Sequence, residues 1–108
     1  MGWDLYLQID TGGPTLADIE NASWNYTYNT TPMLKAAGID LHNFEGRACK
    51  EVIPDLKAGL DNLKSNPIKY TKMNPPNGWG SYDGLIKVLE NMLITFKKHP
   101  KAIVGAWF

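Results

Sequence analysis

The sequence predicts a small α+β domain, with an antiparallel or mixed sheet of three to four strands packed against two main helices. Three observations predict this fold class. Residues 3–10 alternate between apolar and polar side chains, which is the period of a half-buried strand. Residues 53–65 repeat apolar side chains at helical spacing, and so does the segment after Ser81, at Leu85, Val88, Leu89, Met92 and Phe96. Residues 102–108 are apolar on both faces, as in a strand. The chain has 108 residues, so we expect one domain over residues 1–108.

The strands are bounded by residues that interrupt a ladder. Thr11-Gly12-Gly13-Pro14 ends the first strand, because proline cannot donate a backbone hydrogen bond. We expect residues 15–21 to form a short loop or helical turn. Residues 22–29 alternate again and are rich in aromatic side chains, so a second strand is predicted there. Residues 102–108 are expected to be the central strand, with Trp107 and Phe108 buried in the core.

Capping residues and prolines place the helices. Thr31-Pro32 predicts a helix start, and Gly38 is placed to be its left-handed C-terminal residue. Pro54 lacks a backbone N–H and clashes with the preceding helical turn. We therefore expect a separate turn at 47–52 and a helix beginning near residue 53. Ser81 can cap the last helix, which Pro100 prevents from continuing.

Composition excludes several classes of protein. The single cysteine, Cys49, permits no internal disulfide, and the N-terminus lacks a signal-peptide pattern, so a cytoplasmic location is expected. No apolar run reaches the roughly 20 residues that a membrane span needs. The formal net charge is zero, which argues against binding a nucleic acid polymer. His42 and His99 are isolated, so we expect no metal and no cofactor.

The charges are unevenly distributed along the chain. Residues 1–33 contain four acidic residues and no Lys or Arg, a net charge of −4. Residues 34–108 contain eleven basic and seven acidic residues, a net charge of +4. One interpretation is ion pairing within the fold, between an acidic sheet and basic helices. The other is a bipolar surface that guides self-assembly, and on this basis we expect a homodimer.

The first candidate ligand site lies where the second strand leads into a helix. Asn25 and Asn29 supply amides there, and Thr30 or Thr31 would cap the helix. Free backbone N–H groups at a helix N-terminus attract anions. The alternative is that the neighbouring aromatic side chains belong to the core and the polar face is only solvated.

The second candidate site is the loop from Asn74 to Asp83. Two prolines stiffen this loop, and glycines on either side of Trp79 let a backbone approach closely. A rigid loop that presents an aromatic side chain can stack on a planar ligand at small entropic cost. We expect Asn77, Trp79 and Tyr82 to contact such a ligand. The alternative is a structural loop in which Trp79 fills the core.

Three strings of residues resemble a family of small bacterial and phage proteins. They are Gly2-Trp3-Asp4, then Tyr28-Asn29-Thr30-Thr31-Pro32-Met33, and Asn74-Pro75-Pro76-Asn77-Gly78-Trp79-Gly80-Ser81-Tyr82-Asp83. The resemblance covers nearly the whole chain and implies a shared fold, but it carries no established activity. Compact phage proteins of similar size and polar-aromatic character include sponges that sequester nucleotide immune signals, which is a similarity of type.

Three functions follow as hypotheses. The first is a non-enzymatic binder of a small, planar, anionic ligand such as a nucleotide-derived signal, with a pocket joining residues 25–31 to residues 74–82. The alternative is a protein-interaction module that inhibits or scaffolds a partner protein. The third is a small hydrolase or phosphodiesterase. For this third function, Asp4 and Asp10 would lie about 20 Å apart on a flat strand, too far to act as a catalytic pair.

Overall fold

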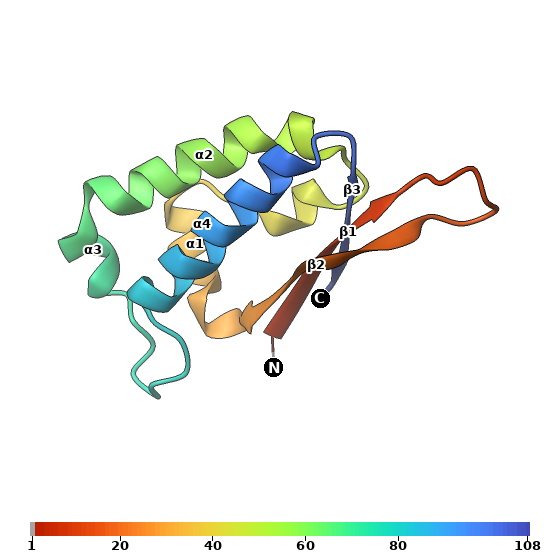
Figure 1. The fold of residues 1–108 in the computed structure, drawn as a ribbon. Helices are drawn as coiled ribbons and strands as arrows, with labels where there is room; N and C mark the ends of the chain where they lie inside the picture. The colour runs from red at the N-terminus through yellow and green to blue at the C-terminus, as the bar shows by residue number, and fades with distance from the viewer. Residues whose placement is uncertain (1) are drawn as a thin grey trace.

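A computed structural model describes residues 2–108 and confirms the α+β fold (Figure 1). The elements are, in chain order, β1 (Gly2–Ile9), β2 (Ala17–Thr27), η1 (Tyr28–Thr30), α1 (Thr31–Ala36), η2 (Leu41–Phe44), α2 (Cys49–Ser65), α3 (Pro67–Thr71), α4 (Tyr82–Lys98) and β3 (Ile103–Trp107). The strands form one antiparallel sheet in the order β2-β1-β3. The first strand of the chain is therefore the central one.

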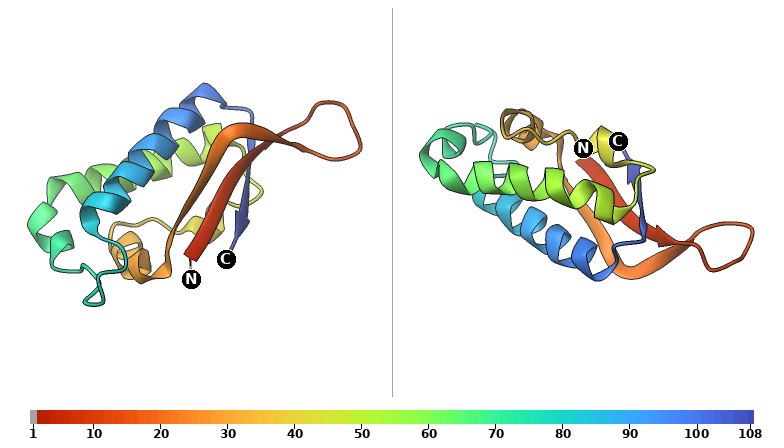
Figure 2. Two further views of the ribbon diagram at one scale, coloured as in Figure 1. Left: turned by 60° about the horizontal axis from the view of Figure 1, so that its bottom comes forward. Right: turned by 90° about the horizontal axis from the view of Figure 1, so that it is seen from above.

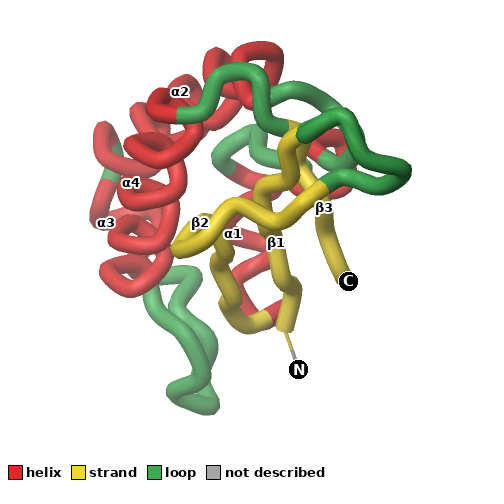
Figure 3. Tube along the Cα trace, turned by 45° about the vertical axis from the view of Figure 1, so that its right-hand side comes forward, coloured by secondary structure: helices red, strands yellow, loops and turns green. Residues whose placement is uncertain are grey.

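The helices cover one face of the sheet and leave the other open (Figures 2 and 3). Trp3, Leu5 and Leu7 of β1 are fully buried and belong to the core that the helices share. The alternate residues of β1 point to the open face. There the side-chain amide of Asn25 in β2 donates a hydrogen bond to the carboxylate of Asp4. The alternation in residues 3–9 thus predicted both faces correctly.

The prediction that residues 102–108 form the central strand is wrong. β3 is the last strand in the order β2-β1-β3, and within residues 2–108 its outer side is bridged only by the short segment 46–48. Trp107 is 70% exposed and Phe108 43% exposed, so neither is the core residue that the sequence suggested. The apolar run arises because β3 uses small residues: Gly105 lies directly against the ring of Tyr6, which covers its open face.

The second strand begins earlier than predicted. Residues 15–21 were expected to be a loop or turn, whereas β2 starts at Ala17. Its pairing with β1 shifts register between the Tyr6–Ser23 pair and the Gln8–Asp18 pair, which inserts extra residues in a bulge. Asn21 lies in that bulge with a φ of 60°, a conformation that asparagine tolerates better than most residues. The extra residues reverse which face of the sheet the alternate side chains point to. The first half of β2 therefore does not continue the alternation of residues 22–29, and the period-two pattern does not reveal it.

Helix α2 is continuous from Cys49, so the predicted break before Pro54 is also wrong. Its first turn is held by tertiary hydrogen bonds, from Cys49 N to Ala102 O (2.8 Å) and from Lys50 N to Pro100 O (2.9 Å). Pro54 follows in the second turn, where its missing N–H removes one bond, to Lys50 O. The two hydrogen bonds to the segment before β3 offset the loss of the bond at Pro54.

The core lies between α2, α4 and the sheet. Leu85, Leu89, Met92 and Phe96 of α4 are all buried, as their spacing predicted. Trp24 of β2 packs edge-on against Phe96, with ring centroids 5.6 Å apart. Within residues 2–108, no helix combines the length and the apolar character needed to cross a bilayer.

Candidate functional site

A small cavity of about 150 Å³ opens at the end of the sheet, where β1 meets α1, η2 and the residue after β3. Ten residues line it: Trp3, Tyr28, Thr31, Leu34, Lys35, Ile39, Asp40, Leu41, His42 and Phe108. Of the residues predicted to bind a ligand, only Thr31 is among them.

The turn after α1 brings the connector back over the cavity. Gly38 has a φ of 87° and follows the helix in a Schellman motif, with Gly38 N bonded to Lys35 O and Ile39 N bonded to Leu34 O. Leu34 and Ile39, the two apolar positions of that motif, are both buried. Asp40 then accepts a hydrogen bond from His42 N (3.0 Å), which starts η2. Gly38 was predicted to end this helix, and its left-handed φ agrees.

Trp3, one of the lining residues, carries an unpaired indole nitrogen. Trp3 is 1% exposed, and among the described residues its Nε1 is the buried side-chain N or O atom that lacks a hydrogen-bond partner. Trp24 shows the usual arrangement, since its Nε1 donates to Asn91 Oδ1 at 2.8 Å. Buried polar groups are paired in the great majority of cases, so the unpaired donor at a cavity needs an explanation.

Two aromatic side chains form the outer wall of the cavity. His42 and Phe108 stack with ring centroids 3.8 Å apart and an interplanar angle of 22°. Both are exposed to solvent, as are Lys35 and Asp40 beside them. The cavity is therefore lined mainly by apolar and aromatic side chains, including the residue with the unpaired donor, and its rim carries one cation and one carboxylate.

The residues predicted at the strand–helix junction bond to their own neighbours. Asn25 Nδ2 donates to Asp4 Oδ1 (2.8 Å) across the open face of the sheet. Asn29 is exposed, and its N–H bonds Thr27 Oγ1. Thr30 is fully buried and donates to Thr27 O (2.8 Å), so its hydroxyl does not cap α1. At six residues, α1 is also too short to offer a strong anion site.

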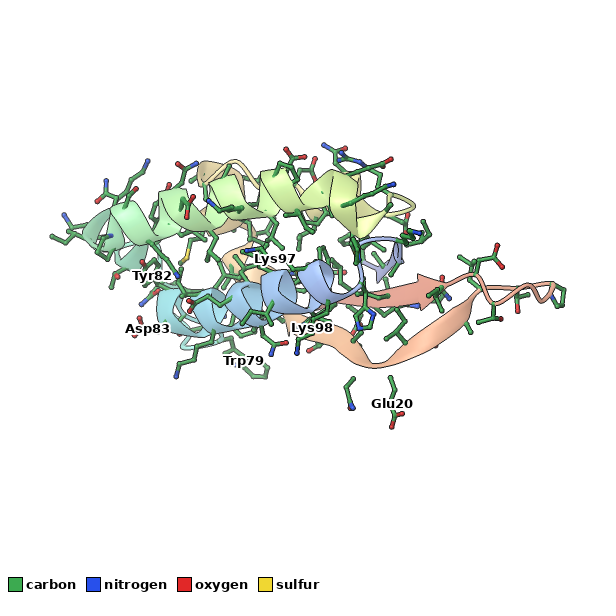
Figure 4. The ribbon with its side chains drawn as sticks, turned by 45° about the horizontal axis from the view of Figure 1, so that its top comes forward. Glu20, Trp79, Tyr82, Asp83, Lys97 and Lys98 are labelled. Carbon is green, nitrogen blue, oxygen red and sulfur yellow. The ribbon has the colours of Figure 1, made fainter. Side chains whose placement is uncertain are left out.

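The loop residues divide between surface and core (Figure 4). Asn77 is exposed and accepts a hydrogen bond from Trp79 N. Trp79 is 66% exposed, so the alternative that it fills the core is wrong. Tyr82 is 9% exposed and lies between the start of α4 and the end of α2, where its hydroxyl donates to Leu63 O. Tyr82 is a core residue here and is not exposed for ligand contact.

The two predicted segments do meet, in direct packing contact. A side chain on Gly80 would collide with the methyl groups of Thr27 and Thr30, so the loop backbone rests on η1. Tyr26 Oη accepts from Ser81 N (3.0 Å) and ties the loop to β2. The N-terminus of α4 is already capped, since Ser81 Oγ accepts from Gly84 N. This junction therefore holds the loop in place.

Two kinds of reactive group, a metal centre and a cysteine nucleophile, can be assessed from the structure. Within residues 2–108, no group of three or more His, Cys, Asp or Glu is placed to hold a metal ion. Cys49 is fully buried, and this burial raises the pKa of its thiol to about 11, partly offset by a backbone hydrogen bond. A thiol with this pKa is protonated at neutral pH and is a poor nucleophile.

The sequence did not point to the cavity because its lining residues are separated along the chain. Trp3 follows the apolar period of its strand, and nothing in that pattern shows that its N–H lacks a partner. Lys35 and His42 join it only through the turn at Gly38. Comparison of the chain with protein-family models, with curated proteins and with solved structures finds no match. The resemblance drawn from the three strings therefore stays a prediction, and the case for function rests on the geometry.

Proposed function

We propose that this chain is a non-enzymatic binder of a small, planar, polar ligand, and that the cavity beside Trp3 is its site. The observation that carries the proposal is the buried, unpaired Nε1 of a residue that lines the cavity. An unmade hydrogen bond at a buried donor costs about 1–3 kcal/mol, and a ligand with an acceptor atom recovers that free energy. The proposal keeps the hypothesis of a planar ligand and moves its site from the junction of residues 25–31 and 74–82 to the cavity.

Size and chemistry narrow the ligand class. A cavity of about 150 Å³ accommodates roughly one six-membered ring. The stacked His42 and Phe108 side chains form a flat aromatic wall, and Lys35 at the rim attracts an anionic substituent. A heteroaromatic ring with a ring nitrogen or carbonyl acceptor satisfies these conditions. A nucleotide satisfies these conditions if its base enters the cavity and its phosphate lies near Lys35. This class of ligand includes nucleotide-derived signals of the kind that phage sponges sequester.

The test is a thermal-shift screen followed by calorimetry, using free nucleobases, nucleosides, mononucleotides and cyclic dinucleotides. Binding should stabilise the protein according to ligand concentration and Kd. Trp3→Phe removes the N–H and keeps an aromatic side chain, and we expect it to weaken binding about tenfold for one lost hydrogen bond. Trp79→Phe is the matched control, because it makes the same change at an exposed indole that does not line the cavity.

Each result has a clear meaning. If no member of the panel stabilises the protein, the proposal is wrong for this ligand class. If Trp3→Phe binds a stabilising compound as tightly as the unmodified chain does, the buried donor is not the recognition element. Chromatography of the ligand after incubation separates the binder from the third hypothesis, because a hydrolase would consume the compound.

A further inference from the structure

The hairpin between β1 and β2 extends well beyond the body of the molecule. Residues 9–20, here called the acidic arm, project from the end of the sheet in every view (Figures 1 and 2). The molecule measures 47 × 26 × 20 Å, and its radius of gyration of 14.0 Å exceeds the about 13 Å expected for a compact chain of this length. Ile9 and Leu16 on the arm are about 40% exposed (41% and 39%). The arm thus carries apolar side chains that its own fold leaves uncovered.

The carboxylates of the arm have no cationic partner among residues 2–108. The arm contains Asp10, Asp18 and Glu20, which are all exposed. The ion pairs found among residues 2–108 all join residues between Arg47 and Glu90. Figure 4 shows Glu20 projecting from β2 away from α4. The interpretation that the acidic sheet is neutralised by the basic helices within one chain is therefore not supported by the ion pairs.

A cluster of lysines lies at the same end of the molecule as the acidic arm. Lys50, Lys97, Lys98 and Lys101, here called the basic corner, come from the start of α2, the end of α4 and the turn before β3. The hydrogen bond from Lys50 N to Pro100 O holds these segments together. All four lysines are exposed, and none takes part in an ion pair with a described residue. They form a cationic surface without an internal partner.

We propose that two copies of this chain associate by laying the acidic arm of each against the basic corner of the other. The two surfaces are complementary in charge and unpaired within the chain. They also lie at one end of the molecule, so a twofold axis can satisfy both contacts at once. Ile9 and Leu16 add apolar area to the contact. Exposed ion pairs are weak and screened by salt, so this association is expected to be strongly salt-dependent.

The first measurement is sedimentation equilibrium of the unmodified chain. At an ionic strength of about 10 mM, where charges act over about 30 Å, we expect a dimer at micromolar concentration. At about 1 M salt the range falls to about 3 Å, and the dissociation constant should rise at least about tenfold. A monomer at low salt would overturn the proposal. So would a dimer that is insensitive to salt, which would point to pairing through a strand edge.

Charge reversal gives the sharper test. The arm variant (Asp18→Lys, Glu20→Lys) leaves one carboxylate against two lysines on the arm, so its arm and its corner are both basic. The corner variant (Lys50→Glu, Lys98→Glu, Lys101→Glu) leaves one lysine against three carboxylates on the corner, so its arm and its corner are both acidic. Each variant alone places like charges opposite one another and should stay monomeric. Mixed in equal amounts, the two variants should form a heterodimer, because both contacts become complementary again.

A control separates this geometry from simple attraction between proteins of opposite net charge. The variant Lys69→Glu, Lys72→Glu, Lys87→Glu has the same net charge as the corner variant, but its changes lie on α3, directly after α3 and on α4, outside the basic corner. It should keep its salt-dependent self-association and should pair with the arm variant less well than the corner variant does. Equal pairing of the arm variant with both partners would overturn the proposal. Circular dichroism establishes that each variant is folded, and the salt series on the unmodified chain decides independently of the variants.

Discussion

The hydroxyl of Tyr82 completes the C-terminal end of α2. In an uninterrupted helix, the carbonyl of Leu63 would accept a hydrogen bond from the N–H of residue 67, but that residue is Pro67 and has none. Tyr82 Oη supplies the missing donor at 2.7 Å, in a bond that is buried. Tyr82 thereby connects the start of α4 to the end of α2.

The substitution Tyr82→Phe isolates this one bond. It keeps the ring, which stacks on Tyr70 at a centroid distance of 6.5 Å and an angle of 7°. The Leu63 carbonyl is then left buried without a partner, and we expect the free energy of unfolding to fall by about 1–3 kcal/mol. For a domain of this size, that corresponds to a fall in Tm of roughly 4–20 °C. Urea denaturation followed by circular dichroism measures the change.

Tyr6→Phe is the matched control. Tyr6 is half-buried on the open face of the sheet, and its hydroxyl makes no hydrogen bond with the described residues. Its substitution should change the free energy of unfolding by no more than about 0.5 kcal/mol. A loss for Tyr82→Phe no larger than that of the control would refute the reasoning, because the bond to Leu63 would then contribute nothing net.

Two further predictions concern the core. Gly59→Ala should destabilise the protein by up to about 2 kcal/mol in thermal melts, since the new methyl group collides with Ile39 and overpacking outweighs the gain in helix propensity; in an Ile39→Ala background the same change should stabilise, and an equal loss in both would contradict this explanation. Cys49 should resist alkylation below pH 9 until the protein is unfolded, because burial raises its thiol pKa from 9.0 to about 11. A folded-state pKa above the unfolded value means that the stability from Cys49 is complete below pH 9 and is lost as the pH rises towards 11, so the urea midpoint should fall more over that range than in Cys49→Ala.

Features with a local physical cause were predictable from the sequence. The alternation in β1 and the apolar stripe of α4 reflect which side of each element meets the core, and both were predicted correctly. Gly38 also acts locally, because its left-handed φ ends α1 whatever the surroundings. These features gave the fold class.

Features that depend on distant residues were not predictable. Considered alone, Pro54 argues against a helix at 49–53. The helix nevertheless forms there because the carbonyls of Pro100 and Ala102 accept hydrogen bonds from its first N–H groups. The run 102–108 suggested a central strand because its small residues share the apolar character of a doubly covered one. The hydrophobic periodicity of a strand does not show which strands it pairs with, so it does not show which strand is central.

The candidate sites also include some features that the sequence predicted and others that depend on tertiary structure. Helix starts near Thr31 and Ser81 were visible in the sequence, and the segments around them do contact each other through Gly80. The sequence did not show that this contact is filled by packing. A cavity lined by residues as distant as Trp3, Lys35 and Phe108 is a property of tertiary structure, and the missing partner of Trp3 Nε1 becomes visible only there.

The pairing of β1 with β3 has a consequence for how the chain folds. The central strand is built from residues 2–9, and one of its two neighbours from residues 103–107. The first turn of α2 likewise waits for residues 100 and 102. Contacts between segments so far apart require a large loop to close, which slows folding. On the ribosome, the hairpin of β1 and β2 can form early, but the sheet is completed only after residue 107 has emerged. Until then Leu5 and Leu7 lack their neighbours from β3, so one edge of this apolar strand stays unpaired until residues 103–107 have been synthesised.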